Sequence, residues 1–150
     1  MSLINKINID LKEAILKKDK LKLESLRAIK TSLIHNQTSV SSEDLVTKED
    51  EIKILQKLVK QRRESASIYK NQNRSDLARQ EEDQADFISF YLPKQLTNQE
   101  AEVIVSNVIN ELNANGLKDM GKVISEVVKK TIGRADGKTI SDIVKQKLSD

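Results

Sequence analysis

Hydrophobic residues recur every three or four positions along most of this chain, which is the pattern of amphipathic helices. The first segment with this pattern is Ser2–Lys17, and the charged run Lys17–Lys20 predicts a turn after it. A second helix is expected next, with an apolar side formed by Leu23, Leu26, Ile29, Leu33 and Ile34. The stretch His35–Val46 is polar and rich in Ser, Thr and Asn, so we expect a mobile loop there.

Two further helices are predicted before the only proline of the chain. Thr47 is placed to cap the first of them, because the acidic residues that follow suit the positive end of a helix dipole. A turn after Lys70 should lead into the next helix, with Ser75 or Asp76 as its cap. That helix is expected to end near Leu92, because a residue before proline disfavours the helical conformation.

The last third of the chain predicts three shorter helices. Thr97–Glu100 has the form of a capping box, in which a hydroxyl and a carboxylate cap the helix start reciprocally. Asn115–Gly116 is expected to end this helix, with the glycine in the left-handed position. Two more helices should follow, one capped by Asp119 and one by Asp136 or Thr139. Their expected buried residues are Val123, Ile124, Val127 and Val128, then Ile140, Ile143, Val144 and Leu148.

The expected fold is therefore all-α, with a four-helix bundle over residues 1–93 and a three-helix bundle over residues 94–150. No segment alternates polar and apolar residues as a strand would, and the sequence contains no internal repeat. The 150 residues are 37% hydrophobic but only 3% aromatic, so the core must consist of Leu, Ile and Val. A content of 33% charged residues with few glycines and prolines also favours helices.

Composition narrows the class of protein further. The chain has no cysteine, which excludes disulfides and thiolate metal sites and is typical of a reducing compartment, so we expect a cytoplasmic protein. No apolar run is long enough to cross a membrane, and no continuous apolar stretch at the N-terminus suggests a signal peptide. A net charge of +3 permits an acidic partner such as RNA without requiring one.

Charged clusters in the first two thirds of the chain have simple interpretations. His35 is the only histidine and has no second ligand nearby, so we expect no metal site and no general base there. The acidic run Glu81–Asp86 could in principle bind Mg²⁺ or do acid–base work, but it lacks a partner base or nucleophile and indicates a solvated face. The basic run Lys57–Lys70 is open to a nucleic-acid interpretation, although Glu64 within it favours an ordinary solvated face.

One apparent nucleotide motif fails on its spacing. The segment GRADGKT resembles the end of a phosphate-binding loop, but only three residues separate its two glycines, where the motif needs four. Such a loop also follows a β-strand, and the preceding EVVKKTI continues a helix. We therefore expect no ATP site, no other cofactor and no catalytic residue.

Three segments together carry a resemblance to a known family. They are YLPKQLT at Tyr91–Thr97, KDMGKVISEV at Lys118–Val127 and GRADGKTIS at Gly133–Ser141. In this order the chain resembles the GatB/YqeY family, most closely the stand-alone YqeY-like proteins, over nearly its whole length. The resemblance implies two helical bundles, four helices followed by three. It also implies kinship with the tail of the B subunit of the tRNA-dependent amidotransferase, a carbon–nitrogen ligase that uses glutamine as amido donor.

In that enzyme the chemistry lies in a separate catalytic domain, and the tail contacts the outer corner of the tRNA. The resemblance therefore implies a non-catalytic module that binds tRNA or another structured RNA, with no membrane partner. Phosphates are bound by Lys, Arg and backbone N–H groups at helix starts. The candidate RNA-binding residues are Lys118, Gly121, Lys122, Lys129, Lys130, Arg134 and Lys138. The alternative at these positions is structural, with Gly121 at a close helix contact and GRADG as a capped turn.

Two other functions remain open at this point. One is a protein–protein adaptor, for example for a partner in tRNA metabolism. An exposed apolar patch around Phe87, Phe90 and Tyr91 would favour it. The other is an amidotransferase in its own right, which would need a pocket with converging titratable groups.

Overall fold

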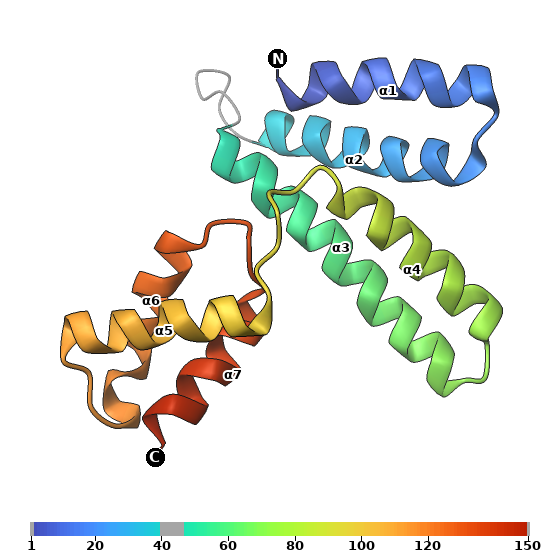
Figure 1. Cartoon of the computed structure of the whole chain (residues 1–150). Coiled ribbons are helices and arrows are strands. Elements are labelled where there is room, and N and C mark those ends of the chain that lie inside the picture. The colour runs from blue at the N-terminus through green and yellow to red at the C-terminus, as the bar shows by residue number, and fades with distance from the viewer. Residues whose placement is uncertain (1, 40–46, 150) are drawn as a thin grey trace. The chain divides into compact units, whose positions relative to one another are not determined.

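The computed structural model describes residues 2–39 and 47–149, and every regular element in this part of the chain is helical (Figure 1). The all-α prediction is confirmed for these residues, since none of them belongs to a strand. The helices are α1 (Leu3–Lys17), α2 (Lys20–Ser39), α3 (Lys48–Asn71), α4 (Ser75–Ser89), α5 (Asn98–Leu112), α6 (Met120–Lys130) and α7 (Gly137–Leu148), with a short 3₁₀ helix η1 (Leu117–Asp119) before α6.

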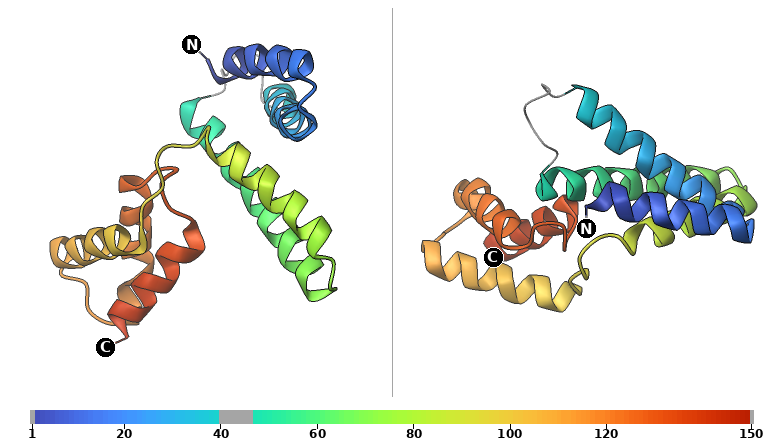
Figure 2. Two further views of the ribbon diagram at one scale, coloured as in Figure 1. Left: turned by 45° about the vertical axis from the view of Figure 1, so that its right-hand side comes forward. Right: turned by 90° about the horizontal axis from the view of Figure 1, so that it is seen from above.

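The helices form two groups that each pack internally. Helices α1–α4 lie in the unit Met1–Leu92, and α5–α7 lie in the unit Pro93–Asp150. Within the first unit, α1 runs antiparallel to α2 and α3 runs antiparallel to α4 (Figure 1; Figure 2). Within the second, α5, α6 and α7 all contact one another. That each group is a domain able to fold by itself stays a prediction.

Each unit has its own aliphatic core, as the low aromatic content requires. In the first unit, fully buried residues come from all four helices: Ile7, Leu26, Ile29, Leu55 and Ile88. Three buried alanines, Ala66, Ala78 and Ala85, lie on α3 and α4. Their small side chains allow the backbones of this pair to come close.

The second unit buries the expected stripe of α7 but only part of that of α6. Ile140, Ile143, Val144 and Leu148 are all buried. Val123 and Val127 are buried too, whereas Val128 keeps 43% of its surface exposed. Val128 lies about 100° further round the helix than Val127, and only one side of α6 faces α5 and α7. The prediction that Val128 is buried is therefore wrong.

Two of the predicted helix starts are confirmed in detail. Thr47 and Thr97 both form capping boxes with the residue three positions on, Asp50 and Glu100. In each box the threonine hydroxyl accepts the backbone N–H of the acidic residue, and the carboxylate accepts the backbone N–H of the threonine. These reciprocal bonds satisfy donors that have no partner inside the helix.

Other helix ends differ from the prediction. α4 starts after Arg74 without a side-chain cap, and Asp76 instead lies inside the helix and pairs with Arg74. α5 ends at Leu112 because Asn113 adopts the left-handed conformation (φ 50°), a position that asparagine tolerates better than most residues. Gly116 (φ 77°) then serves the entry into η1 rather than the end of α5. Asp119 and Asp136 occupy N-cap positions without side-chain cap bonds.

The predicted loop His35–Val46 is partly helix. α2 continues to Ser39, so residues 35–39 are helical, and residues 40–46 lie outside the described residues. The polar run was taken to end the helix, but residues 35–39 contain neither glycine nor proline, and polar residues of this kind cost a helix only a few tenths of a kcal/mol each, roughly. Among the described helices, none is long and apolar enough to span a membrane.

Candidate functional site

The seven candidate residues lie in three places in the second unit. Five are on η1 and α6, Arg134 lies in the turn between α6 and α7, and Lys138 lies in the first turn of α7. The residues on η1 and α6 are Lys118, Gly121, Lys122, Lys129 and Lys130. Sequence proximity does not put all of them on one surface, because a helix turns 100° per residue.

Two of the lysines lie on the same side of α6, and a third precedes them in η1. Lys122 and Lys129 are seven residues apart, which is close to two full turns and about 10 Å along the axis. Lys118 precedes Lys122 by four residues, in η1. All three are exposed, and none forms an ion pair with another residue in the described part of the chain. We call Lys118, Lys122 and Lys129 the α6 lysine row.

Lys130 belongs to a different contact. Its Nζ lies 2.8 Å from Oε2 of Glu111 on α5, and this hydrogen bond raises the pKa of Lys130 above its ordinary value. Lys130 therefore joins α6 to α5 instead of extending the lysine row. Lys138 is exposed at the start of α7, without an ion pair among the described residues.

Arg134 is held by the segment that precedes α5. Its Nε donates to the backbone carbonyl of Lys94 at 3.1 Å, and its own carbonyl accepts the backbone N–H of Leu96 at 2.8 Å. The Gln95 side-chain amide donates to the carbonyl of Gly133 at 2.6 Å. These three bonds tie residues 94–96 to residues 133–134. The YLPKQLT and GRADG segments are therefore in contact, and Arg134 has a structural role.

The four glycines divide into two kinds. Gly116 (φ 77°) and Gly133 (φ 73°) adopt backbone conformations that favour glycine. Gly121 and Gly137 do not, and a Cβ atom added at either would meet no atom within 4 Å. The alternative that Gly121 makes a close contact with another helix is therefore wrong. Its missing side chain leaves the backbone at the start of α6 open to the outside.

Three exposed aliphatic residues on or next to α6 are not predicted from the sequence: one lies in η1, one on α6 and one in the turn after α6. Leu117, Val128 and Ile132 are 51%, 43% and 41% exposed. The helical spacing accounts for the exposure of Val128, because this residue lies seven positions after the exposed Gly121 and so at nearly the same angle round α6. We call Leu117, Val128 and Ile132 the α6 apolar line.

The apolar patch at Phe87, Phe90 and Tyr91 that would favour an adaptor is reduced to one exposed residue. Phe90 is 83% exposed, but Phe87 and Tyr91 pack against the core of the first unit. The Tyr91 hydroxyl donates to the Asp10 carboxylate, and burial together with this bond raises the pKa of Tyr91. Tyr91 thereby joins the end of α4 to α1.

The basic run of α3 and the acidic run of α4 face each other. Arg63 pairs with Asp86, and Lys70 pairs with Glu82. These contacts run along the antiparallel α3–α4 pair, so both runs are engaged in holding it together. Lys57 and Lys60 of the basic run remain exposed, with no ion pair to a described residue.

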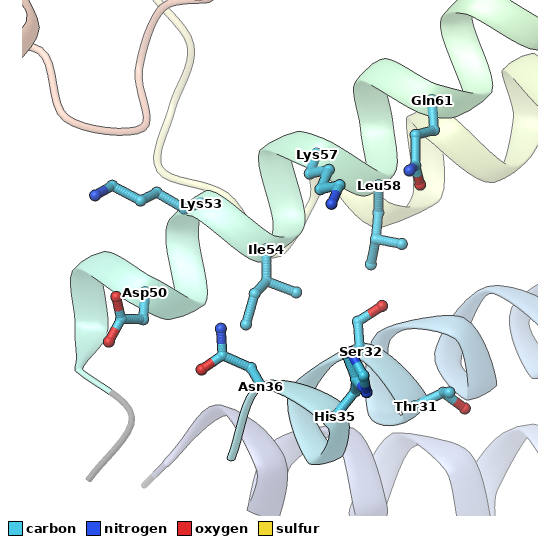
Figure 3. A pocket seen from close by; sticks show the side chains of 10 residues that line it. All are labelled: Thr31, Ser32, His35, Asn36, Asp50, Lys53, Ile54, Lys57, Leu58 and Gln61. Carbon is cyan, nitrogen blue, oxygen red and sulfur yellow. The ribbon is translucent and has the colours of Figure 1, made fainter. Parts of the chain in front are cut away.

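A cleft of about 470 Å³ lies between α2 and α3 in the first unit (Figure 3). Ile54 and Leu58 extend from α3 toward α2, and Lys57 and Gln61 point into the same space (Figure 3). The facing side is lined by Thr31, Ser32, His35 and Asn36 of α2. His35, for which the sequence predicts neither a metal site nor a general-base role, therefore lines this cleft.

Asp50 is the only carboxylate among the residues lining the cleft. It accepts the backbone N–H of Thr47 as part of the capping box, which ties it to the start of α3. No group of three or more His, Cys, Asp or Glu that could hold a metal ion occurs within residues 2–39 and 47–149.

Comparison with known proteins identifies the family. The family model described as Yqey-like protein matches residues 4–148, which is nearly the whole chain. The chain belongs to the YqeY-like family. The match includes both units, so the joined 94–96 and 133–134 segments, the α6 lysine row and the α2–α3 cleft all lie within the YqeY-like region.

Curated YqeY-like relatives occur in fungi under the name "Altered inheritance of mitochondria protein 41, mitochondrial". The protein of Lachancea thermotolerans is 31% identical over 147 residues, covering 91% of this chain and 76% of the relative. That of Vanderwaltozyma polyspora is 35% identical over 124 residues, covering 79% of this chain and 65% of the relative. The match to the Clavispora lusitaniae protein spans 66% of that relative. The YqeY-like chain thus corresponds to about two thirds to three quarters of each of these proteins.

Proposed function

We propose that this YqeY-like chain is a non-catalytic RNA-binding module whose ligand is tRNA or another structured RNA. The observation that carries the proposal is the α6 lysine row. Its three lysines are exposed and have no acidic partner in the described part of the chain, whereas neighbouring Lys130 and Arg134 are engaged within the protein. Lysines without an internal partner are available to phosphate oxygens.

The start of α6 adds a second feature that suits phosphate. Gly121 is exposed and has open space where a side chain would be, so a phosphate group can approach the backbone in the first turn of α6. Glu126 on α6 reduces the positive charge, so binding should be modest and should weaken steeply with salt. Shape rather than base sequence is the expected basis of recognition.

The proposed link to tRNA-dependent amidation rests on the resemblance to the amidotransferase tail. We propose no catalysis in this chain, and in the α2–α3 cleft the one carboxylate of the lining is already bonded in a helix cap. The location that we propose is the cytoplasm, on the ground of the missing cysteines.

The proposal is tested by measuring equilibrium binding of the full chain to purified total tRNA at low salt. The informative variant is Lys122→Ala/Lys129→Ala, because both lysines are exposed and neither contributes an ion pair to the fold. Loss of two phosphate contacts should weaken binding about tenfold or more. Arg134 is left unchanged, because its replacement would also disturb the segment before α5.

A charge-matched control is Lys60→Ala/Lys145→Ala, which removes two exposed lysines from α3 and α7. This control should bind nearly as well as the wild type. Equal loss in both double variants would show non-specific attraction of a basic protein to RNA, and absence of low-salt binding by the wild type would refute the proposal.

A second candidate, a protein adaptor, is favoured by the α6 apolar line. Three exposed aliphatic side chains next to lysines suit an acidic amphipathic helix of a protein partner. Calorimetry with a purified glutamine-dependent amidotransferase tests it, using Val128→Ser/Ile132→Ser. Binding by the wild type that this variant loses, while tRNA binding is unchanged, would favour the adaptor.

A further inference from the structure

The α2–α3 cleft has the size and lining of a small-molecule site. Its volume of about 470 Å³ lies within the range of ligand pockets, roughly 300 to 1,000 Å³. Ile54 and Leu58 supply an apolar surface, and hydroxyl groups of Thr31 and Ser32 lie on the facing helix (Figure 3). A few polar groups around an apolar surface are the usual composition of such sites.

Charge in the cleft selects the class of ligand. Lys57 points into the space between the two helices, and Lys53, one turn earlier, also lines the cleft but extends away from α2 (Figure 3). Neither lysine is paired with a carboxylate of the described residues, although α3 carries acidic residues in its first turn. Asp50, the acidic residue of the lining, is held by the Thr47 cap. Two lysines and one carboxylate line the cleft, so its lining carries a net positive charge beside an apolar surface.

We propose that the cleft binds a small organic anion, with its carboxylate or phosphate group on Lys57 and its apolar part on Ile54 and Leu58. Lys53 adds charge to the lining, and Gln61 supplies an amide for a second polar group. A charge-assisted hydrogen bond fixes the anion, and aliphatic contact gives preference for an organic ligand over a bare ion. This site is separate from the RNA-binding proposal, because all of its residues belong to the first unit.

The test is a titration of the full chain, followed by backbone amide NMR, with three probes at constant pH and ionic strength. Inorganic phosphate tests the charged group alone, succinate tests a small dicarboxylate, and adenosine monophosphate tests a larger phosphate ester. Saturable shifts confined to residues 31–36 and 50–61 are expected with at least one of the two organic probes. Phosphate alone should bind more weakly than that probe.

The variant Lys57→Gln should weaken binding of the responsive probe about tenfold, the effect of losing one charge-assisted hydrogen bond. Lys60→Gln is the matched control. It removes the same charge one turn further along α3, and Lys60 does not line the cleft. Both lysines are exposed, so both variants should keep the wild-type spectrum. The proposal is overturned if neither organic probe saturates, if phosphate binds as well as both, or if both variants lose affinity equally.

Discussion

At the scale of single residues, Gly116 and Gly121 in the second unit differ in whether their backbone conformation requires a glycine. Gly116 has φ 77° and ψ 172°, a backbone region that is almost exclusive to glycine. Gly121 lies in ordinary helix and has open space where a side chain would be. A helix would gain stability from alanine at that position, roughly 0.5–1 kcal/mol in a helix interior and less in the first turn. Packing within the protein therefore does not require a glycine at position 121, and our proposal is that RNA approaches the backbone there.

The two glycines should respond oppositely to alanine. Gly116→Ala is expected to lower the free energy of unfolding by about 1–3 kcal/mol, because it forces a strained backbone. Gly121→Ala should leave stability unchanged or slightly raised, yet weaken tRNA binding several-fold. Urea denaturation and tRNA titration of both variants check this. Unchanged tRNA binding of Gly121→Ala would show that the backbone at Gly121 is not approached.

Tyr91 illustrates how one hydroxyl connects two helices of the first unit. Replacing it with phenylalanine keeps the packing against the core but removes the hydrogen bond to Asp10. We expect Tyr91→Phe to lose about 1–2 kcal/mol in free energy of unfolding, since the acceptor is charged. Tyr69→Phe is a matched control, because no hydrogen bond joins the Tyr69 hydroxyl to a described residue. Similar losses in both variants would contradict this role of the Asp10 contact.

At the scale of elements, hydrogen bonds join two segments of the second unit that are distant in sequence. Residues 94–96 and 133–134 are about forty positions apart, yet three bonds join them. Both segments are recognisable in the sequence as separate motifs. Their pairing could not be predicted, because local patterns carry no information on which distant backbone group a side chain will meet.

Because residues 94–96 and 133–134 are joined by hydrogen bonds, we expect substitutions there to change stability and substitutions in the α6 lysine row to change RNA binding. Gln95→Ala should lower the thermal stability of the protein, by about 1 kcal/mol for the lost hydrogen bonds, without changing tRNA affinity at a temperature where the chain is folded. Lys122→Ala should do the reverse. Thermal unfolding and tRNA titration of the two single variants check this. Weakened RNA binding in Gln95→Ala at full folding would place this segment in the RNA-binding surface.

The capping box at the start of α5 predicts a pH dependence. The backbone N–H of Thr97 and then its hydroxyl hold the pKa of Glu100 below its ordinary value. A lowered pKa in the folded state means that the stabilisation is present above the unfolded pKa, about 4.3, and is lost as pH falls through the folded value. Glu100→Gln should therefore be less stable than the wild type at pH 7, and this difference in stability should be smaller at pH 3.

Urea denaturation at both pH values measures this difference, with Glu102→Gln as the control on the same helix. Glu102 is exposed and takes no part in the capping box. A stability gap between wild type and Glu100→Gln that persists unchanged at pH 3 would rule out the charged cap as its source.

At the scale of the whole molecule, the spacing of hydrophobic residues predicts the positions of the helices better than the tertiary contacts of their side chains. The all-α class, the capping boxes at Thr47 and Thr97 and the core face of α7 follow from local spacing, and the structure confirms them. The availability of each basic residue does not follow from spacing. Lys129 and Lys130 are adjacent in sequence, but only Lys130 meets a carboxylate, that of Glu111 on another helix. Tertiary neighbours therefore decide which of the candidate basic residues lack a partner within the described residues.

The central claim is that the α6 lysine row binds RNA phosphates, and its most direct test is the salt dependence of tRNA binding. The logarithm of the binding constant should fall linearly with the logarithm of salt concentration, because bound phosphates release counterions. Removing Lys122 and Lys129 should make this slope shallower by about 2, while Lys60→Ala/Lys145→Ala keeps the wild-type slope. Equal slopes for the wild type and the Lys122→Ala/Lys129→Ala variant would contradict the account.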